Sequence, residues 1–214
     1  MNSFSRRAML RTTALSAALI GGSLMFGTTP AFAALAVGQA APAFTAVDSK
    51  GKEHKLADFK GKVVVLEWTN HDCPYVKKHY TSSNMQNLQK QATDAGVVWL
   101  SVISSAPGEQ GHVEGAKADE LSASRKAVPT AVLLDPKGTI GKAYDARTTP
   151  HMYVIDAKGV LRYAGGIDSI ASTKVEDVAK ADPYFKTALE AVVKGEEVKQ
   201  TVTRPYGCNV KYKS

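Results

Sequence analysis

Cys73 and Cys208 are the two cysteines of the chain and its candidate nucleophiles. Cys73 precedes Pro74, and proline is typical of the first position of a helix, where its missing N–H would be unpaired anyway. The N–H groups and the dipole at a helix start stabilise an anion, so this placement lowers the pKa of a thiol into the reactive range. We expect His71 to tune the thiol. The alternative is that Cys73 is an inert, buried small residue.

Cys208 lies near the end of the sequence, in the turn-forming stretch Arg204–Asn209. Three roles are open for it: a thiol that resolves oxidised Cys73, one half of a structural disulfide, or a bridge to another chain. The even cysteine count, in a chain with an export signal, favours pairing with Cys73. The sequence alone does not separate a catalytic bridge from a structural one.

A metal site is a further alternative. His71, Cys73 and His151 offer one thiolate and two imidazoles, which are ligands that suit copper or zinc. Two cysteines are too few for a four-cysteine zinc site, and we predict no metal and no other cofactor. We expect His54, His79 and His112 on the surface.

The elements that must position these residues alternate between strand and helix. The run Val63–Trp68 is almost wholly apolar and β-branched or aromatic, which indicates a central strand buried on both faces. Cys73 follows that strand directly and opens the next helix, which is broken around Thr81–Asn84. Further strands are predicted at Val97–Ile103 and Ala131–Leu134, and a hairpin at Tyr153–Asp156 with Val160–Tyr163. An interrupted last helix is predicted at Val175–Lys194. This order predicts an α/β fold, a mixed central sheet flanked by helices on both faces.

The first 33 residues read as an export signal. They contain Arg6, Arg7 and Arg11, no acidic residue, an apolar run, and the small-x-small end Ala31–Ala33. The pair Arg6-Arg7 resembles the twin-arginine signal, and an ordinary secretory signal is the alternative. We therefore expect a periplasmic or otherwise exported protein that is not embedded in a membrane after cleavage.

The net charge of +7 does not indicate a polyanionic partner. Removal of the three signal arginines leaves 24 − 20 = +4 from the 27 Lys+Arg and 20 Asp+Glu. The remaining lysines are scattered and do not alternate with aromatic residues, which argues against nucleic acid. We predict three parts: the signal at 1–33, a domain at 34–194, and a C-terminal tail at 195–214 that carries Cys208.

Two blocks of the sequence resemble the thioredoxin-fold redoxins of the alkyl hydroperoxide reductase and thiol-specific antioxidant group. Together they cover roughly 38–166. The first block consists of Gly38–Phe44, Asp48–Lys52, Leu56–Trp68 and Cys73–Tyr75. The second consists of Leu134–Gly138, Ala143–Tyr144, Thr148–Asp156, Gly159–Leu161 and Tyr163–Gly165. The stretch Trp68–Pro74 and the ending Tyr206–Cys208 are similar to a peroxiredoxin-like subgroup. The resemblance implies a thioredoxin-like fold.

The resemblance also implies site residues. Pro150 would be the cis proline that faces Cys73, because a cis bond is cheap only before proline. Thr149 would present its backbone to a substrate, and Pro74 would help to shape the same groove. An ordinary trans proline in a loop is the alternative.

The departures from the group concern its chemistry. Val76 stands where thioredoxins carry a second cysteine, so a local two-thiol cycle is impossible. Asn70 stands where peroxiredoxins need Thr or Ser, with Thr69 one residue away. Pro150 occupies the region of their arginine, and Arg147 lies three residues before it.

The sequence therefore predicts an exported cysteine-dependent oxidoreductase or antioxidant, with Cys73 as nucleophile and Cys208 as candidate resolving thiol. Its reaction would be thiol–disulfide exchange or peroxide reduction. Its partners would be a peroxide or disulfide substrate and a protein or small-molecule thiol as electron donor. The alternatives are a non-catalytic binding module with a structural Cys73–Cys208 disulfide, and a copper-binding protein.

Overall fold

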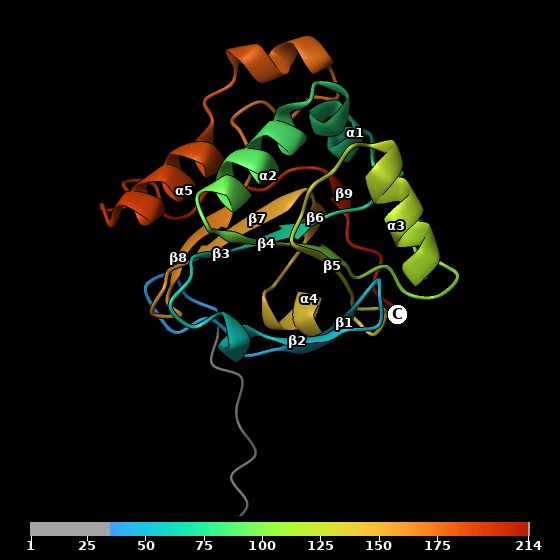
Figure 1. The fold of residues 1–214 in the computed structure, drawn as a ribbon. Helices are drawn as coiled ribbons and strands as arrows, with labels where there is room; N and C mark the ends of the chain where they lie inside the picture. Colours follow the sequence, from blue (N-terminus) through green and yellow to red (C-terminus); the bar gives the residue numbers. More distant parts are fainter. Residues whose placement is uncertain (1–34, 214) are drawn as a thin grey trace, which may run out of the picture. The chain divides into compact units, whose positions relative to one another are not determined.

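A seven-stranded mixed sheet is the centre of the structure, a computed structural model that describes residues 35–213 (Figure 1). The predicted signal peptide, 1–33, lies outside the described residues. The strand order is β2-β1-β5-β4-β3-β7-β8. The strands are β1 (Thr45–Asp48), β2 (Glu53–Lys55), β3 (Val64–Trp68), β4 (Val98–Ile103), β5 (Ala131–Leu134), β7 (His151–Ile155) and β8 (Leu161–Gly165).

β3 lies inside this sheet, and all five of its residues are buried, as its apolar sequence predicts. It runs parallel to β4 and antiparallel to β7, whose first residue, His151, pairs with Trp68 at the end of β3. The chain segment that precedes β7 therefore lies beside the segment that follows β3. The predicted mixed sheet is confirmed.

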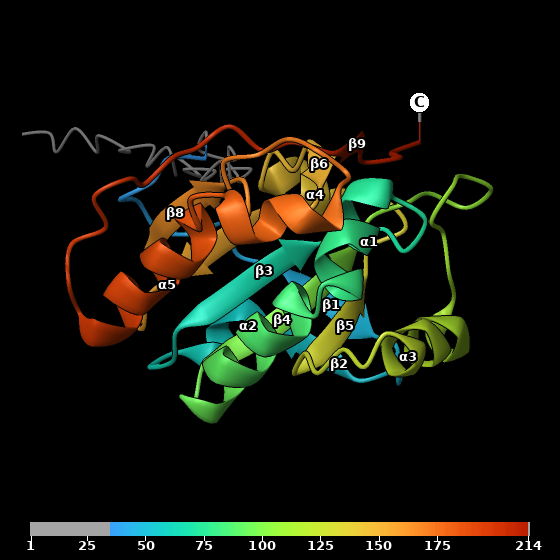
Figure 2. The ribbon, with the colours of Figure 1, turned by 90° about the horizontal axis from the view of Figure 1, so that it is seen from above.

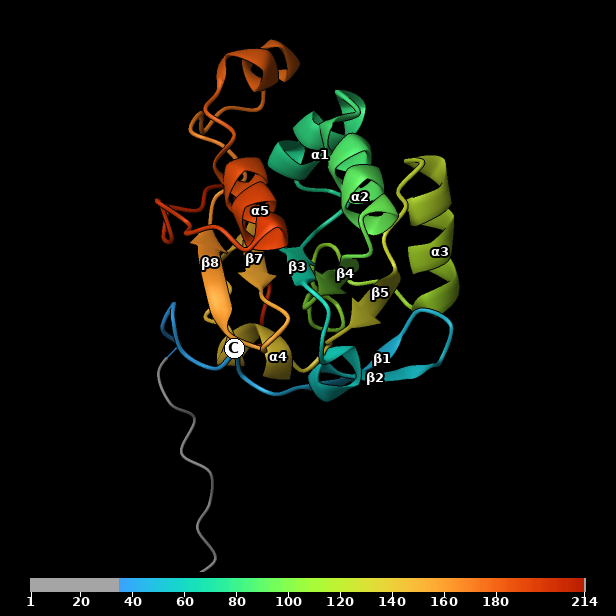
Figure 3. The same ribbon diagram turned by 60° about the vertical axis from the view of Figure 1, so that its left-hand side comes forward.

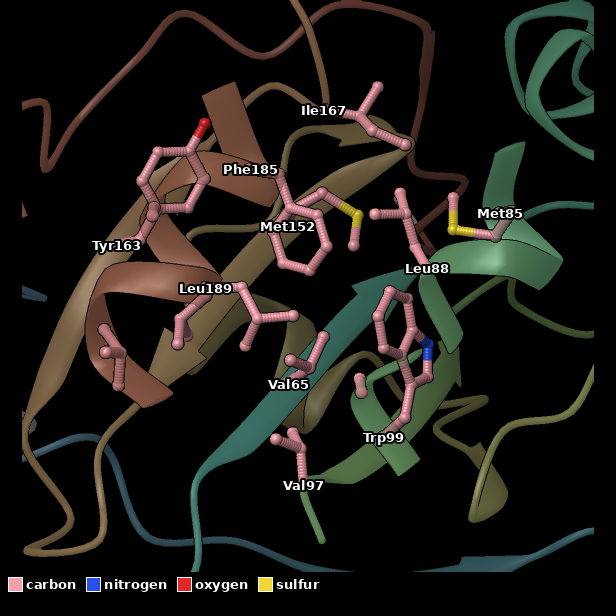
Figure 4. Packing of buried hydrophobic residues seen from close by; sticks show 14 of the residues in the cluster. Val65, Met85, Leu88, Val97, Trp99, Met152, Tyr163, Ile167, Phe185 and Leu189 are labelled. Carbon is pink, nitrogen blue, oxygen red and sulfur yellow. The ribbon is translucent and has the colours of Figure 1, made fainter. Parts of the chain in front are cut away.

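Helices cover one face of the sheet: α1 (Pro74–Thr81), α2 (Asn84–Asp94) and α5 (Tyr184–Lys194) (Figure 1). Their apolar side chains pack with those of the strands in one cluster, in which Phe185 meets Trp99 edge to face (Figure 4). Cys73 and Val76 belong to this cluster, so the first turn of α1 is fixed by core packing. The predicted break in the helix is confirmed between α1 and α2.

The opposite face is covered by a short helix, α4 (Thr139–Ala143), and by aromatic side chains. Tyr144 contacts Phe44, Trp68 and Tyr153. α3 (Gly115–Ser124) packs beside β5 (Figure 3). Sequence patterns do not predict α4, because five residues are too few for a helical period. Two 3₁₀ turns complete the fold, η1 (Leu56–Phe59) and η2 (Val175–Lys180), and the second replaces the first part of the last helix that we predicted.

The tail after α5 runs back across the domain, and near its end it forms one strand of a second, two-stranded sheet (Figure 2). In that sheet β9 (Cys208–Asn209) pairs with β6 (Thr148–Thr149) in antiparallel register. Residues 195–213 are thus attached to the thioredoxin-like domain by backbone pairing. No helix within 35–213 combines the length and the apolar character needed to cross a bilayer.

Candidate functional site

Cys73 is the N-cap residue of α1, and Pro74 is the first residue of that helix. The loop between β3 and α1 is closed by Asn70, whose side-chain oxygen accepts the Asp72 N–H at 2.9 Å. The Asn70 carbonyl accepts the Cys73 N–H at 3.1 Å. The side chain of Cys73 is fully buried. A buried strand, a tight loop and a helix start therefore hold the thiol in one place.

Thr149 and Pro150 lie opposite this thiol. The peptide bond between them is cis, which confirms the prediction for Pro150. The Cys73 thiol donates a hydrogen bond to the Thr149 carbonyl at 3.0 Å. Pairing of β3 with β7 brings this segment to Cys73, since Pro150 immediately precedes β7.

Cys208 is brought to the same place by the β6–β9 pairing, in which Thr149 and Cys208 are direct partners. Each thiol lies near enough to the other to shift its pKa, and both are free in this structure. Gly207 permits this approach. It adopts a φ of +137°, and a β-carbon at its position would overlap the Thr149 carbonyl oxygen.

The surroundings shift the two thiol pKa values in opposite directions. Burial raises the pKa of Cys73, but hydrogen bonds from the Cys208 thiol, the Thr149 hydroxyl and the Val76 N–H outweigh it and lower that pKa overall. The pKa of Cys208 is raised to about 11, first by burial and then by the hydrogen bond to Cys73 and the charge of Cys73. Cys73 is therefore the thiol that ionises first, and Cys208 keeps its proton.

Tyr206 fixes the tail on one side of Cys208. Its hydroxyl donates to a carboxylate oxygen of Asp168 and lies 3.1 Å from both the Lys78 ammonium and the His79 Nε2. The Lys78 ammonium also contacts the second oxygen of Asp168, at 3.5 Å. Burial, and then the charge of Lys78, lower the pKa of His79 to about 3, so His79 is neutral and its contact with Asp168 is not an ion pair. These four side chains are named the Tyr206 anchor below.

Tyr212 fixes the tail on the other side. Its hydroxyl donates to the Ala146 carbonyl at 2.7 Å, and its ring covers Gly138 and Gly141, where a β-carbon would overlap it. Backbone hydrogen bonds join Val210 to the Arg147 carbonyl and the Lys211 carbonyl to the Ala106 N–H. Cys208 thus lies between two anchored tyrosines.

His71 lies two residues before Cys73, but its side chain contacts Asp72. Its Nε2 is 3.2 Å from Asp72, and it lines a cavity of about 530 Å³ with Tyr80 and Arg125. Burial, and then nearby cations, lower the pKa of His71 despite Asp72. The structure joins Cys73, Thr149, Pro150 and Cys208, while the role of His71 in tuning the thiol stays a prediction.

Lys78, His79 and His54 are buried polar side chains. Lys78, which follows Cys73 on α1, turns into the core and belongs to the Tyr206 anchor rather than to the thiol. His79 and His54 are buried, not at the surface as expected; His54 pairs with Asp48 at 2.8 Å. An amphipathic pattern does not reveal the burial of Lys78 and His79, because their partners Asp168 and Tyr206 lie far along the chain.

His151 and Arg147 flank the cis proline. Burial lowers the pKa of His151 to about 3, and its Nδ1 lies 3.0 Å from the Tyr153 hydroxyl. Arg147 has 72% of its side chain exposed and pairs with Asp145. Within 35–213, no three His, Cys, Asp or Glu side chains gather as a set of metal ligands.

Sequence reasoning missed the Tyr206 anchor and a buried carboxylate, Glu67. Glu67 accepts hydrogen bonds from Tyr80, Gln89, Trp99 and Ser101 at 2.8–3.1 Å. A single acidic residue in an otherwise apolar strand was the available signal for Glu67. For Tyr206 the signal was its position two residues before Cys208.

The comparisons with known proteins agree with this geometry. Residues 37–164 match the model of the AhpC/TSA family. Thiol-disulfide oxidoreductase ResA of Geobacillus kaustophilus is 27% identical over 166 residues, which is 73% of this chain and 86% of that protein. Thioredoxin-like protein YneN of Bacillus subtilis is 30% identical over 125 residues, 58% of this chain and 68% of that protein.

A solved structure shows the same fold. It is an uncharacterized conserved protein from Geobacillus kaustophilus, with a TM-score of 0.69 and 23% identity; the match covers 83% of this chain and 93% of that one. With the family match over more than half of the sequence, these findings establish that the chain is a thioredoxin-fold redoxin of the AhpC/TSA family, related to thiol–disulfide oxidoreductases.

Proposed function

We propose that this protein is an exported thiol–disulfide oxidoreductase in which Cys73 is the reactive thiol and Cys208 its partner. The observation that supports this most is the thiol–thiol contact beside Thr149 and Pro150, with the pKa of Cys73 lowered and that of Cys208 raised. A pair of this kind provides one ionised nucleophile and one protonated thiol. The second cysteine of a local Cys-x-x-Cys motif is replaced by a residue from the far end of the chain.

The reaction balances without a cofactor. The Cys73 thiolate attacks one sulfur of a substrate disulfide, which breaks the substrate S–S bond and releases one substrate thiolate. Cys208 then loses its proton and attacks the sulfur of Cys73, which releases the second substrate thiolate. The protein pair is oxidised to a disulfide and the substrate is reduced to two thiols. The natural partners would be proteins or small molecules that carry thiols or disulfides.

Single-cysteine variants of the purified protein test this proposal. We expect C73S to lose disulfide-exchange activity and C208A to accumulate a stable mixed disulfide on Cys73. We also expect the pKa of Cys73, read from the pH dependence of alkylation, to be higher in C208A, because one stabilising hydrogen bond is gone. Exchange by C73S at the rate of the unaltered protein would contradict the proposal. So would a Cys73–Cys208 bond that resists mild thiol reductants, since that result identifies a structural bridge.

Peroxide reduction is a second candidate, because Cys73 is fully buried and a small oxidant reaches it more readily than a protein does. The Cys73 thiolate would attack the peroxide O–O bond, become a sulfenic acid and release an alcohol or water. Cys208 would then form the disulfide and release water. Peroxide consumption measured on the same variants separates the two candidates. Asn70 and the exposed Arg147 give this reaction less support than exchange.

Export rests on residues 1–33. Replacement of both arginines, R6K with R7K, tests the twin-arginine interpretation in cells. We expect the protein to stay in the cytoplasm, whereas an ordinary secretory signal tolerates the change.

The proposal that His71 tunes the thiol is tested by H71Q, which then shifts the alkylation pH profile of Cys73.

A further inference from the structure

The cavity of about 530 Å³ that His71 lines is bounded by α1, the start of α2 and the end of α3, which are neighbours in Figure 3. α1 contributes Lys77, Tyr80 and Thr81 to its lining. Lys78 and His79 belong instead to the Tyr206 anchor. The volume falls within the range of about 300–1,000 Å³ that small-molecule sites occupy. The cavity is therefore separate from the contact between the two thiols and has room for a small molecule.

Positive charge predominates around this cavity. Lys77, Arg125 and Lys126 line it. Asp72 is the one acidic residue among the described residues of the lining, and it already contacts His71 at 3.2 Å. A concave surface that carries more positive than negative charge attracts anions. The lining therefore favours an anionic ligand.

Arg125 is held in place with part of its guanidinium unused. The guanidinium carbon lies 4.2 Å from the centre of the Tyr80 ring, and Nε donates to the Leu121 carbonyl at 3.3 Å. Tyr80 is itself fixed, because its hydroxyl donates to Glu67 at 2.8 Å. Nη1 of Arg125 is buried and has no hydrogen-bond partner within residues 35–213. A guanidinium that is oriented in this way suits a carboxylate, which accepts two parallel hydrogen bonds.

Gln86 leaves an acceptor free in the same lining. Its Nε2 donates to the carbonyls of Tyr80 and Arg125 at 2.8 and 2.7 Å. Because both partners are acceptors, the nitrogen of the amide faces them, and Oε1 is left buried without a partner among the described residues. Gln86 and Arg125 are half-buried and line the cavity, so a ligand seated against them supplies the missing partners. Such a ligand carries a carboxylate for Arg125 and an N–H group for Gln86.

Two backbone conformations mark the same cavity. Ser83 and Lys126 line it and have φ values of +60° and +54°, in the left-handed region that residues other than glycine rarely adopt. Residues held in such conformations cluster at functional sites, because the surrounding structure has to offset their cost. The strain therefore supports a role in binding.

We propose that this cavity is a binding site for a small molecule that carries a carboxylate and a neighbouring amide N–H, as an N-acylated amino acid or a short peptide does. Arg125 binds the carboxylate, and Gln86 accepts the N–H. Lys77 and Lys126, whose side chains are exposed, add positive charge at the entrance. The site goes beyond the proposed function, because neither thiol takes part in it.

Calorimetric titration of the purified protein with N-acetylglutamate is the direct test, and glutarate and glutaramide are the matched probes. Glutarate lacks the acetamido group, and glutaramide lacks both charges. We expect N-acetylglutamate to bind about two- to tenfold more tightly than glutarate, because one hydrogen bond is added. Glutaramide should not bind. Absence of binding by N-acetylglutamate at millimolar concentrations would overturn the inference, and so would equal affinity for all three probes.

Variants locate the binding. R125Q should weaken the binding of N-acetylglutamate by at least about tenfold, because hydrogen bonds from a charged donor are lost. R162Q is the matched control, since Arg162 is exposed and pairs with Asp156 outside this lining, and it should leave the affinity unchanged. K77Q changes an exposed side chain of the lining and should weaken binding by about two- to fivefold.

Two further results complete the test. Circular dichroism checks that each variant is folded, and K77Q keeps the test decisive if R125Q is not, because its side chain lies at the surface. C73S should bind N-acetylglutamate as the unaltered protein does. Loss of binding in C73S would place the ligand at the thiols and contradict the inference. Equal affinities of R162Q, K77Q and the unaltered protein, with R125Q either the same or unfolded, would contradict it as well.

Discussion

The surroundings of Cys73 and of Cys208 are built in different ways. Cys73 is held by regular structure: a buried strand, a helix start and a cis proline, all within the core. Cys208 lies on a tail with one two-residue strand, and side chains hold it, chiefly Tyr206 and Tyr212. The first arrangement lowers the pKa of the Cys73 thiol, and the second places the Cys208 thiol beside it.

The difference shows how a redoxin without a local second cysteine can place one. Val76 occupies the position in α1 where the helix would carry its own partner thiol. In the proposed function the tail supplies that thiol instead, and the attachment of the tail includes the buried pair Lys78 and Asp168. Changes in the residues that hold the tail should therefore separate Cys208 from Cys73.

K78M removes the cation of the Tyr206 anchor. Removal of one partner of a buried ion pair leaves a charge without compensation, so we expect the free energy of unfolding to fall by about 3–5 kcal/mol. Urea titration measures the change. K90M is the matched control, because it breaks an exposed pair with Asp94 and should change little. Equal effects of the two variants would show that the buried pair does not stabilise the tail.

Acid should destabilise the surroundings of both cysteines, through His79 in the Tyr206 anchor and through His151 beside the cis proline. Each has a folded-state pKa of about 3, below the ordinary 6.5. Their contribution to stability is complete above pH 6.5 and is lost as the pH falls towards 3, because the unfolded chain takes up the protons. We expect a loss of about 2 kcal/mol per histidine by pH 5. Urea titrations between pH 7 and 4 measure it, and H79Q should halve the slope; an unchanged slope would contradict the assignment.

G207A places a β-carbon against the Thr149 carbonyl and strains the backbone. We expect a loss of about 1–3 kcal/mol in stability and a greater separation of the two thiols. Alkylation of Cys73 should become faster, and its pKa should rise because the Cys208 hydrogen bond weakens. G61A is the control, since Gly61 also has a positive φ but has no neighbour near its β-carbon. If both variants leave Cys73 equally protected, close approach at 207 is not required.

Two tyrosine variants compare the anchors themselves. Y212F removes one hydrogen bond to a carbonyl, which we expect to cost about 0.5–1.5 kcal/mol. Y206F removes a hydrogen bond to a carboxylate, for which about 1.5–3 kcal/mol is expected. Urea titration of the two proteins measures the order. The reverse order would make Tyr212 the main attachment of the tail.

Much of the thioredoxin-like core could be predicted from local pattern. The apolar run before Trp68, Pro74 after Cys73, and the hairpin near the end each have a strong signal, and the structure confirms them. The cis bond at Pro150 was predicted from the resemblance and is confirmed. α4 and the structure of the tail were not predictable in this way, because short elements have no periodicity that tells them from loops.

The sequence by itself determined that Cys73 would stand between a buried strand and a helix start, since apolar runs and proline act over a few residues. Only the tertiary structure decided which groups face that thiol. The β6–β9 pairing, the buried Lys78–Asp168 contact and the place of Tyr206 join residues that are up to 128 positions apart. Such contacts depend on how the sheet and tail pack, and no local pattern contains that information. The count of two cysteines identified the candidate pair, and the fold brought the two thiols together.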